Sequence, residues 1–210
     1  MRVVVRAATP ADVPMIAALL TSSLSDDPFF RPLLPEGPQR LTGAVRFFAA
    51  YALTHLGRDR ALDVACADDG RVLGVAAWTY RPEGRSSLAS RQTGRSVHYV
   101  RAIGVRKILR ALRLRQEIEH RRPFGTHWWL SAIAVDESAR RLGVGSALLT
   151  HRLALIDAAH EAAYVEATSD TAVALCECFR FLPQATQGGN AGYPMQAMSR
   201  EPTRPMHRYD

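Results

Sequence analysis

One stretch of this sequence decides the fold: Leu130-Ser131-Ala132-Ile133-Ala134-Val135-Asp136-Glu137-Ser138-Ala139-Arg140-Arg141-Leu142-Gly143-Val144-Gly145-Ser146-Ala147-Leu148-Leu149. Its first half predicts a buried strand, and its second half predicts an amphipathic helix over residues 144–159. Gly143 and Gly145 lack a Cβ, so the backbone between the two elements can approach a ligand closely. A helix that opens in this way presents unpaired N–H groups at the positive end of its dipole, which favours phosphate. The spacing alone also allows a second interpretation, a strand–helix turn in which glycine only permits tight packing.

The sequence on both sides of this stretch predicts one mixed α/β domain. Thr9-Pro10 is typical of a helix start, and Asp68-Asp69-Gly70 is typical of a hairpin turn. We see no internal repeat and no long linker, so we expect a domain at residues 1–200 and a flexible tail at 201–210. The expected helices cover residues 13–24, 39–56, 95–122, 144–159 and 172–178, and the expected strands cover residues 3–6, 61–67, 71–80, 127–135, 164–168, 179–184 and 194–200.

Composition narrows the class of protein. The 210 residues contain 47% hydrophobic and 22% charged residues, which is ordinary for a globular protein. No apolar run is long enough for a membrane span, and Arg6 ends the first apolar stretch too early for a signal peptide. The three cysteines have no disulfide spacing, so we expect a cytoplasmic protein with no membrane partner. Cys176 and Cys178 would point in different directions on a helix, so we expect no metal site.

The net charge of +7 is concentrated between residues 95 and 122, which carry nine basic and two acidic residues. This segment could bind nucleic acid or an anionic ligand such as CoA. We favour a second interpretation, the solvated face of an amphipathic helix, because apolar residues recur along the segment at helical spacing. Aromatic residues are not interleaved with the basic ones, so we expect no nucleic-acid partner.

The deciding stretch resembles the GNAT superfamily of acetyltransferases. Arg140-Arg141-Leu142-Gly143-Val144-Gly145 is similar to the Arg/Gln-x-x-Gly-x-Gly/Ala loop of that family, and Ile133-Ala134-Val135 is similar to the strand before it. The resemblance covers nearly the whole chain, beginning with Val5-Arg6-Ala7-Ala8-Thr9-Pro10-Ala11-Asp12-Val13-Pro14. Three further segments look like a subgroup similar to puromycin N-acetyltransferase: His127-Trp128-Trp129-Leu130, Glu166-Ala167-Thr168 and Met198-Ser199-Arg200.

This resemblance implies a single GNAT-type domain, with a central, mostly antiparallel mixed sheet that is flanked by helices and contains a splayed central strand pair. It implies acetyl-CoA as co-substrate and direct attack of an amine on the thioester. Backbone N–H groups of the loop would hold the pyrophosphate, from Arg140, Arg141, Leu142, Gly143, Val144, Gly145 and Ser146. Ile133, Ala134 and Val135 would pair with the pantetheine arm, and the Val135 N–H could polarise the thioester carbonyl.

The chain departs from the family at several positions. The usual Asn and Tyr of the helix after residue 168 are replaced by Ala172 and Cys176. The Tyr commonly protonates the departing thiolate, so Cys176 becomes the candidate acid, although its side chain is shorter. Two customary glycines are replaced by Arg141 and Arg180.

Candidates for the acceptor side follow from the same resemblance. Glu166 is the candidate base, because strand ends beside the thioester face the acceptor; a structural ion pair is the alternative. Asp26 and Asp27 could bind the charge of an amine, or could be surface acids at a helix end. Trp128 and Trp129 alternate across a strand, so one is expected in the core and the other, Trp129, could wall the acceptor pocket.

We therefore expect an N-acetyltransferase that acts on a small-molecule amine, as a monomer or homodimer. Two alternatives stay open: a protein or peptide acceptor, and a CoA-binding module with weak or no catalysis. The sequence does not identify the acceptor.

Overall fold

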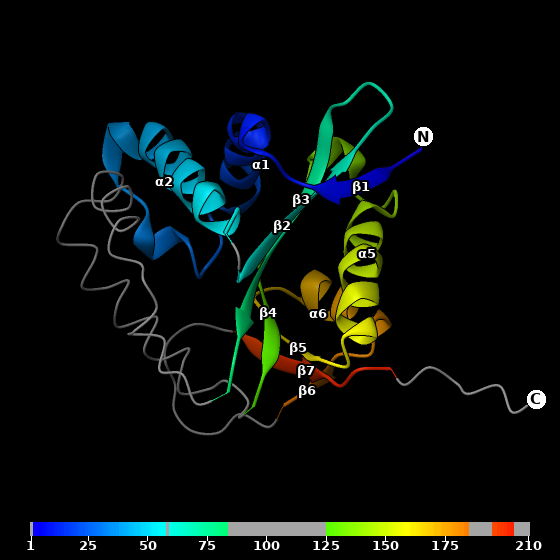
Figure 1. Cartoon of the computed structure of the whole chain (residues 1–210). Coiled ribbons are helices and arrows are strands. Elements are labelled where there is room, and N and C mark those ends of the chain that lie inside the picture. Colours follow the sequence, from blue (N-terminus) through cyan, green and yellow to red (C-terminus); the bar gives the residue numbers. More distant parts are fainter. Residues whose placement is uncertain (1, 58, 84–124, 185–194, 204–210) are drawn as a thin grey trace, which may run out of the picture.

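The computed structural model describes residues 2–57, 59–83, 125–184 and 195–203 (Figure 1). Within these residues, seven strands form one sheet in the order β1-β2-β3-β4-β5-β7-β6. Neighbouring strands are antiparallel, except that β4 and β5 are parallel. The strands are β1 (Val4–Ala7), β2 (Arg60–Cys66), β3 (Val72–Arg81), β4 (His127–Val135), β5 (Ala162–Ala167), β6 (Leu182–Pro183) and β7 (Gln196–Arg200). The expected mixed, mostly antiparallel sheet is confirmed.

Helices cover both faces of this sheet (Figure 1). On one face lie α1 (Val13–Leu24) and α2 (Arg40–His55), and on the other lie α5 (Val144–Ala158) and α6 (Asp170–Cys178). Each face has its own apolar cluster, because strand side chains alternate between the two. Gly74 of β3 lets α5 approach the sheet closely: a Cβ there would lie 2.7 Å from Cγ1 of Val144. The expected basic helix at 95–122 and residues 204–210 of the expected tail lie outside the described residues.

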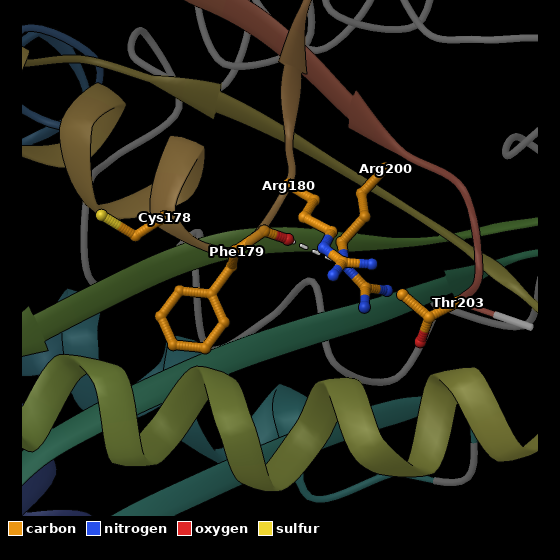
Figure 2. A pocket seen from close by; sticks show the side chains of 5 residues that line it. All are labelled: Cys178, Phe179, Arg180, Arg200 and Thr203. Carbon is orange, nitrogen blue, oxygen red and sulfur yellow. Dashed lines mark hydrogen bonds between the residues drawn. The ribbon is translucent and has the colours of Figure 1, made fainter. Parts of the chain in front are cut away.

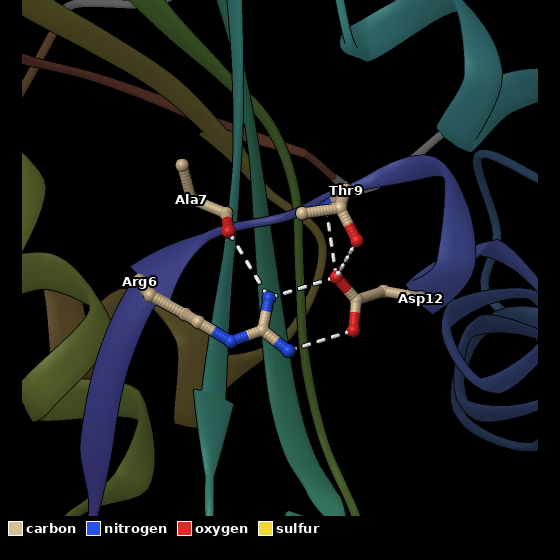
Figure 3. Close-up of polar contacts among 4 residues, drawn as sticks. All are labelled: Arg6, Ala7, Thr9 and Asp12. Carbon is tan, nitrogen blue, oxygen red and sulfur yellow. Dashed lines mark hydrogen bonds and ion pairs between the residues drawn. The ribbon is translucent and has the colours of Figure 1, made fainter.

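The predicted helix start after β1 is confirmed, with a 3-10 turn (Pro10–Asp12) before α1 (Figure 3). The Asp12 carboxylate accepts hydrogen bonds from the Thr9 N–H at 2.7 Å and the Thr9 hydroxyl at 2.9 Å. Arg6 donates to both of its oxygens, at 2.8 and 2.7 Å. The hydrogen bond with Arg6 is the main reason that the pKa of Asp12 lies well below its usual range, so this buried carboxylate stays ionised and ties β1 to the entry of α1.

Both arginines that replace customary glycines adopt left-handed backbone conformations. Arg141 has φ 62° and Arg180 has φ 64°. This conformation costs about 1–2 kcal/mol for a residue with a Cβ. Both turns therefore have the backbone shape that glycine favours, and each arginine lowers the stability of the fold by about that amount. The turn at Arg180 also shortens the strand expected at 179–184, which is observed only as β6.

Candidate active site

The centre of the sheet opens between β4 and β5. The two strands pair from His127–Ala162 to Leu130–Val165, although both strands are described beyond these residues. On the other side, β4 pairs with β3 along its length, but Ala77 faces Ala132 while Trp78 faces Leu130. Ser131 is therefore the extra residue of a β-bulge, a feature that bends a strand. The bulge lies where β4 leaves β5, and the expected splayed strand pair is confirmed.

The backbone of β4 beyond the bulge directs N–H groups toward this opening. The Asp136 N–H donates to the carbonyl of Leu73 on the β3 side, at 2.8 Å. Successive N–H groups of a strand point in opposite directions, so those of Val135 and Ile133 face away from β3. These are donors suited to an extended ligand or to a carbonyl oxygen. Assignment of pantetheine to Ile133, Ala134 and Val135 remains a prediction.

The loop after β4 is ordered by its own polar contacts. The Asp136 carboxylate accepts from the Ser138 N–H at 3.0 Å, which starts a 3-10 turn at Glu137–Ala139. Hydrogen bonding to the Ser138 hydroxyl is the main cause that lowers the pKa of Asp136. The chain then passes through exposed residues 140–143, and Gly143 ends the loop with φ 78°.

The start of α5 supplies a second set of free donors. The first bond into the helix runs from the Ala147 N–H to the Gly143 carbonyl, at 2.9 Å. Within the described helix, the N–H groups of Val144, Gly145 and Ser146 therefore have no helical acceptor, and glycine at the N-cap has no side chain to satisfy them. Exposed Arg140 and Arg141 add positive charge next to this helix end. These free donors are suited to an anion such as a pyrophosphate, and the binding of pyrophosphate by this loop remains a prediction.

Gly145 also lies against the strand and against α6. A Cβ at this position would be 3.3 Å from Cδ2 of Leu175 and 3.7 Å from Cγ2 of Val135. The helix start and the end of β4 are thus in close proximity, so one ligand can contact the donors of both. Leu142, which was also predicted to belong to the loop site, is exposed.

The predicted acceptor residues lie on the α1–α2 side of the sheet or on the segment that follows α1. Glu166 follows Val165 on β5, at the opening, and accepts a hydrogen bond from the Tyr164 hydroxyl at 3.3 Å. Trp129 packs against the α1–α2 cluster, whereas Trp128 packs against the α5 cluster, so the two tryptophans do alternate. The guanidinium of Arg81 lies 5.6 Å from the centroid of the Trp129 ring.

Asp26 and Asp27 have different surroundings. The Asp26 carboxylate is exposed and forms an ion pair with Arg40 at the start of α2. Asp27 accepts from the Phe29 N–H at 2.8 Å and from the Thr168 hydroxyl at 2.6 Å. Asp27 therefore joins the segment after α1 to the end of β5, near Glu166. Their predicted role in binding an amine remains a prediction.

Cys176, the candidate acid, is a buried residue of α6 in the α5-side cluster, whereas Cys178 is exposed. Burial raises the pKa of the Cys176 thiol to about 11. The thiol is therefore protonated at neutral pH and is a weak acid. Its catalytic role remains a prediction.

Sequence reasoning missed a polar network that links α2 to the bulge. The Ser131 hydroxyl lies 2.7 Å from the Tyr51 hydroxyl and 3.2 Å from Nε2 of His55. A serine inside an otherwise apolar strand was the only signal in the sequence, and Tyr51 and His55 read as ordinary residues of an amphipathic helix.

A shallow hollow of about 350 Å³ lies elsewhere, lined by Cys178, Phe179, Arg180, Arg200 and Thr203 (Figure 2). Arg200 is engaged there, because Nε donates to the Phe179 carbonyl at 2.9 Å and the guanidinium pairs with Asp157 at 2.7 Å. None of the predicted site residues lines this hollow. Within the described residues, no three His, Cys, Asp or Glu side chains are grouped to hold a metal ion, and no helix is long and apolar enough to cross a bilayer.

Comparison with known proteins gives the same architecture. The model of the acetyltransferase (GNAT) family matches residues 24–181. A structure from Corynebacterium glutamicum, described as histone acetyltransferase HPA2 and related acetyltransferase, is 28% identical with a TM-score of 0.70, over 98% of this chain and 99% of that chain. The GNAT family N-acetyltransferase YhbS of Escherichia coli, solved with CoA, is 17% identical with a TM-score of 0.56, over 97% and 83%. Polyamine N-acetyltransferase of Drosophila melanogaster, which forms N-acetylagmatine, is 13% identical with a TM-score of 0.58, over 95% and 100%. Comparison with curated protein sequences finds no match.

Proposed function

The chain belongs to the GNAT family of acetyltransferases and is an acyl-CoA-dependent N-acyltransferase, and from this premise we propose that it transfers an acetyl group from acetyl-CoA to the amine of a small molecule. The observation that carries the proposal is the opening of β4 from β5 beside the N-terminus of α5. Two sets of backbone donors meet there, one suited to a pyrophosphate and one to an acyl group.

In the proposed complex, the N–H groups of residues 144–146 hold the pyrophosphate, and those of Ile133 and Val135 bind the arm and polarise the thioester carbonyl. The amine attacks the carbonyl carbon directly, and the thiolate of CoA leaves without a covalent enzyme intermediate. Most of the rate enhancement comes from holding two substrates in one geometry.

Glu166 is the proposed base on the acceptor side, because it stands on β5 just past the last residue paired with β4. It would take the proton that the amine loses. Cys176 is the proposed acid, and its high pKa makes it a weak one. A thiolate is a good leaving group near neutral pH, so a weak acid is compatible with turnover.

A small amine is the proposed acceptor because carboxylates of Asp26, Asp27 and Glu166 occur on the acceptor side and could attract its charge, with Trp129 as a wall. The Drosophila neighbour, which forms N-acetylagmatine, acts on an acceptor of this kind. The motifs of residues 127–130 and 166–168 support, within the family, a place near puromycin N-acetyltransferase. The Corynebacterium structure, described as a histone acetyltransferase, keeps a protein amine as the second candidate.

The test is turnover of acetyl-CoA with a panel of small amines and lysine peptides, followed by release of free thiol. We expect release with at least one small amine, and a loss of at least tenfold in kcat for Glu166→Gln. Tight binding of acetyl-CoA without turnover would favour a CoA-binding module, and turnover restricted to peptides would favour the second candidate.

Three further properties belong to this proposal. Residues 1–200 form the catalytic domain and residues 201–210 form a tail. A variant truncated after residue 200 should therefore keep full activity. A reducing cytoplasm suits the free thiols of Cys66, Cys176 and Cys178. Sedimentation should distinguish a monomer from a homodimer.

A further inference from the structure

The bulge of β4 is held by side chains of α2. Tyr51 and His55 are one helical turn apart, so both reach the same point of the sheet. Their partner is Ser131, whose hydroxyl also lies 3.1 Å from the carbonyl oxygen of Ala77 across the bulge. Tyr51 and His55 are buried, and their rings are in contact, tilted by 35° with centroids 4.2 Å apart. Ser131 is thus joined to a packed helix as well as to β3.

The direction of each hydrogen bond follows from the available donors. Nδ1 of His55 lies 2.8 Å from the Tyr51 carbonyl, which can only accept, so Nδ1 carries the proton and Nε2 is a bare acceptor. The single Ser131 hydrogen then serves either Nε2 or the Ala77 carbonyl, and the Tyr51 hydroxyl donates to Ser131. Burial and the nearby positive charge of Arg60 lower the pKa of His55 to about 3, so the network is neutral at physiological pH.

The bulge changes which face each later residue of β4 occupies. Leu130 belongs to the cluster on the α5 side, whereas Ala132 belongs to the cluster on the α1–α2 side. Regular alternation would place these two residues on the same face. The extra residue at 131 also shifts by one position the alternation of N–H directions, so it decides that Ile133 and Val135 face the opening.

We propose, resting on the acetyl transfer proposed above, that Tyr51 and His55 are positioning residues that hold the Ser131 bulge. They thereby direct the N–H groups of Ile133 and Val135 toward the pantetheine arm and the thioester carbonyl. These side chains act through the backbone of β4 and do not touch the reacting atoms. The pyrophosphate site at the start of α5 does not depend on them.

The experiment compares Ser131→Ala, Tyr51→Phe and the double variant with the wild type. Tyr51→Phe removes one hydroxyl and keeps the ring among Phe30, Phe47 and Phe48. We expect each single variant to lose about tenfold in kcat, because a small misplacement of catalytic groups has effects of this order or larger. KM for acetyl-CoA should change less than about threefold. The double variant should lose no more than the worse single variant, since both remove the same hydrogen bond.

Two controls separate positioning from stability. Ser131→Thr keeps the hydroxyl and should restore most of kcat. Thr21→Val removes a buried hydroxyl that donates to the Ala17 carbonyl at 2.7 Å in α1, and should leave kcat unchanged. Single variants with wild-type kcat, or additive losses in the double variant, would overturn the proposal. A loss of kcat in Thr21→Val in proportion to its fall in melting temperature would also overturn the proposal, because kcat would then follow stability and not the position of β4.

A second measurement needs no amine acceptor. Amide NMR shifts of Ile133 and Val135, and their response to acetyl-CoA, should change in Ser131→Ala and Tyr51→Phe but not in Thr21→Val. Unchanged shifts in both variants would refute the positioning role. A wild type that turns over no amine, yet shows these shift changes, would refute the proposed function and leave the control of the bulge supported.

Discussion

Gly145→Asp tests the assignment of the pyrophosphate to the start of α5. Gly145 is the second residue of that helix, and its N–H precedes the first intrahelical bond. A new Cβ would meet the flexible end of Leu175 at 3.3 Å and Val135 at 3.7 Å, so the site can accept a side chain with a small shift. The variant is therefore expected to fold.

The expected loss in affinity follows from charge. A carboxylate about 5 Å from a pyrophosphate costs about 1–3 kcal/mol per unit charge at an effective dielectric constant of ~80 to ~20. A loss of about 1.4 kcal/mol is tenfold in Kd, so we expect acetyl-CoA to bind at least tenfold more weakly. In the free protein, the same charge at a helix N-terminus stabilises by about 0.3–1 kcal/mol, so the melting temperature should not fall with the affinity.

Calorimetry with acetyl-CoA, at low and physiological salt, measures this effect. Gly145→Asn has nearly the same shape without the charge, and Gly145→Ala has only the Cβ. We expect both to bind more tightly than Gly145→Asp, with a difference that shrinks as salt rises. A folded Gly145→Asp variant that binds acetyl-CoA as tightly as the wild type would show that this loop does not bind the pyrophosphate. Equal losses for Asp and Asn would show that shape, and not charge, is responsible.

Three other variants test separate features. Cys176→Ala should retain turnover on any acceptor found, because the buried thiol is a weak acid; a loss of ~10³-fold in kcat, with the fold intact, would make Cys176 the acid. Arg180→Gly should raise the melting temperature, because the left-handed backbone conformation of residue 180 costs about 1 kcal/mol for a residue with a Cβ. Arg180→Ala keeps the Cβ and should not raise it. The hydrogen bonds from Arg200 lower the pKa of Asp157 to about 2, so the wild type should exceed Asp157→Asn in unfolding free energy above about pH 4. That advantage should vanish as the pH falls toward 2. Urea unfolding of both proteins at several pH values measures it, and a difference in unfolding free energy that does not change with pH would contradict the prediction.

Local signals in the sequence were enough to predict the class of fold and the strand, loop and helix that form the proposed phosphate site. The alternation of apolar residues, the turn at residues 68–70 and the glycines at 143 and 145 each act within a few residues. The strand, loop and helix at 127–158 therefore occur nearly where the sequence placed them. The same local reasoning identified the start of α1 at Thr9 and Pro10.

Tertiary structure alone decided the acceptor side. Asp27 meets Thr168 although 141 positions separate them, and Tyr51 meets Ser131 across 80 positions. Neither pair has a local pattern, because each exists only when α1 and α2 pack on the sheet. The bulge at Ser131 is likewise a property of two strands and not of one, since an extra residue is defined only against the partner that it fails to pair with. The sequence by itself determined most of the elements and the strand–loop–helix that we propose as the anion site, because their interactions are local. The packing of distant segments decided the shape of the opening between β4 and β5, where we propose that the acyl group binds.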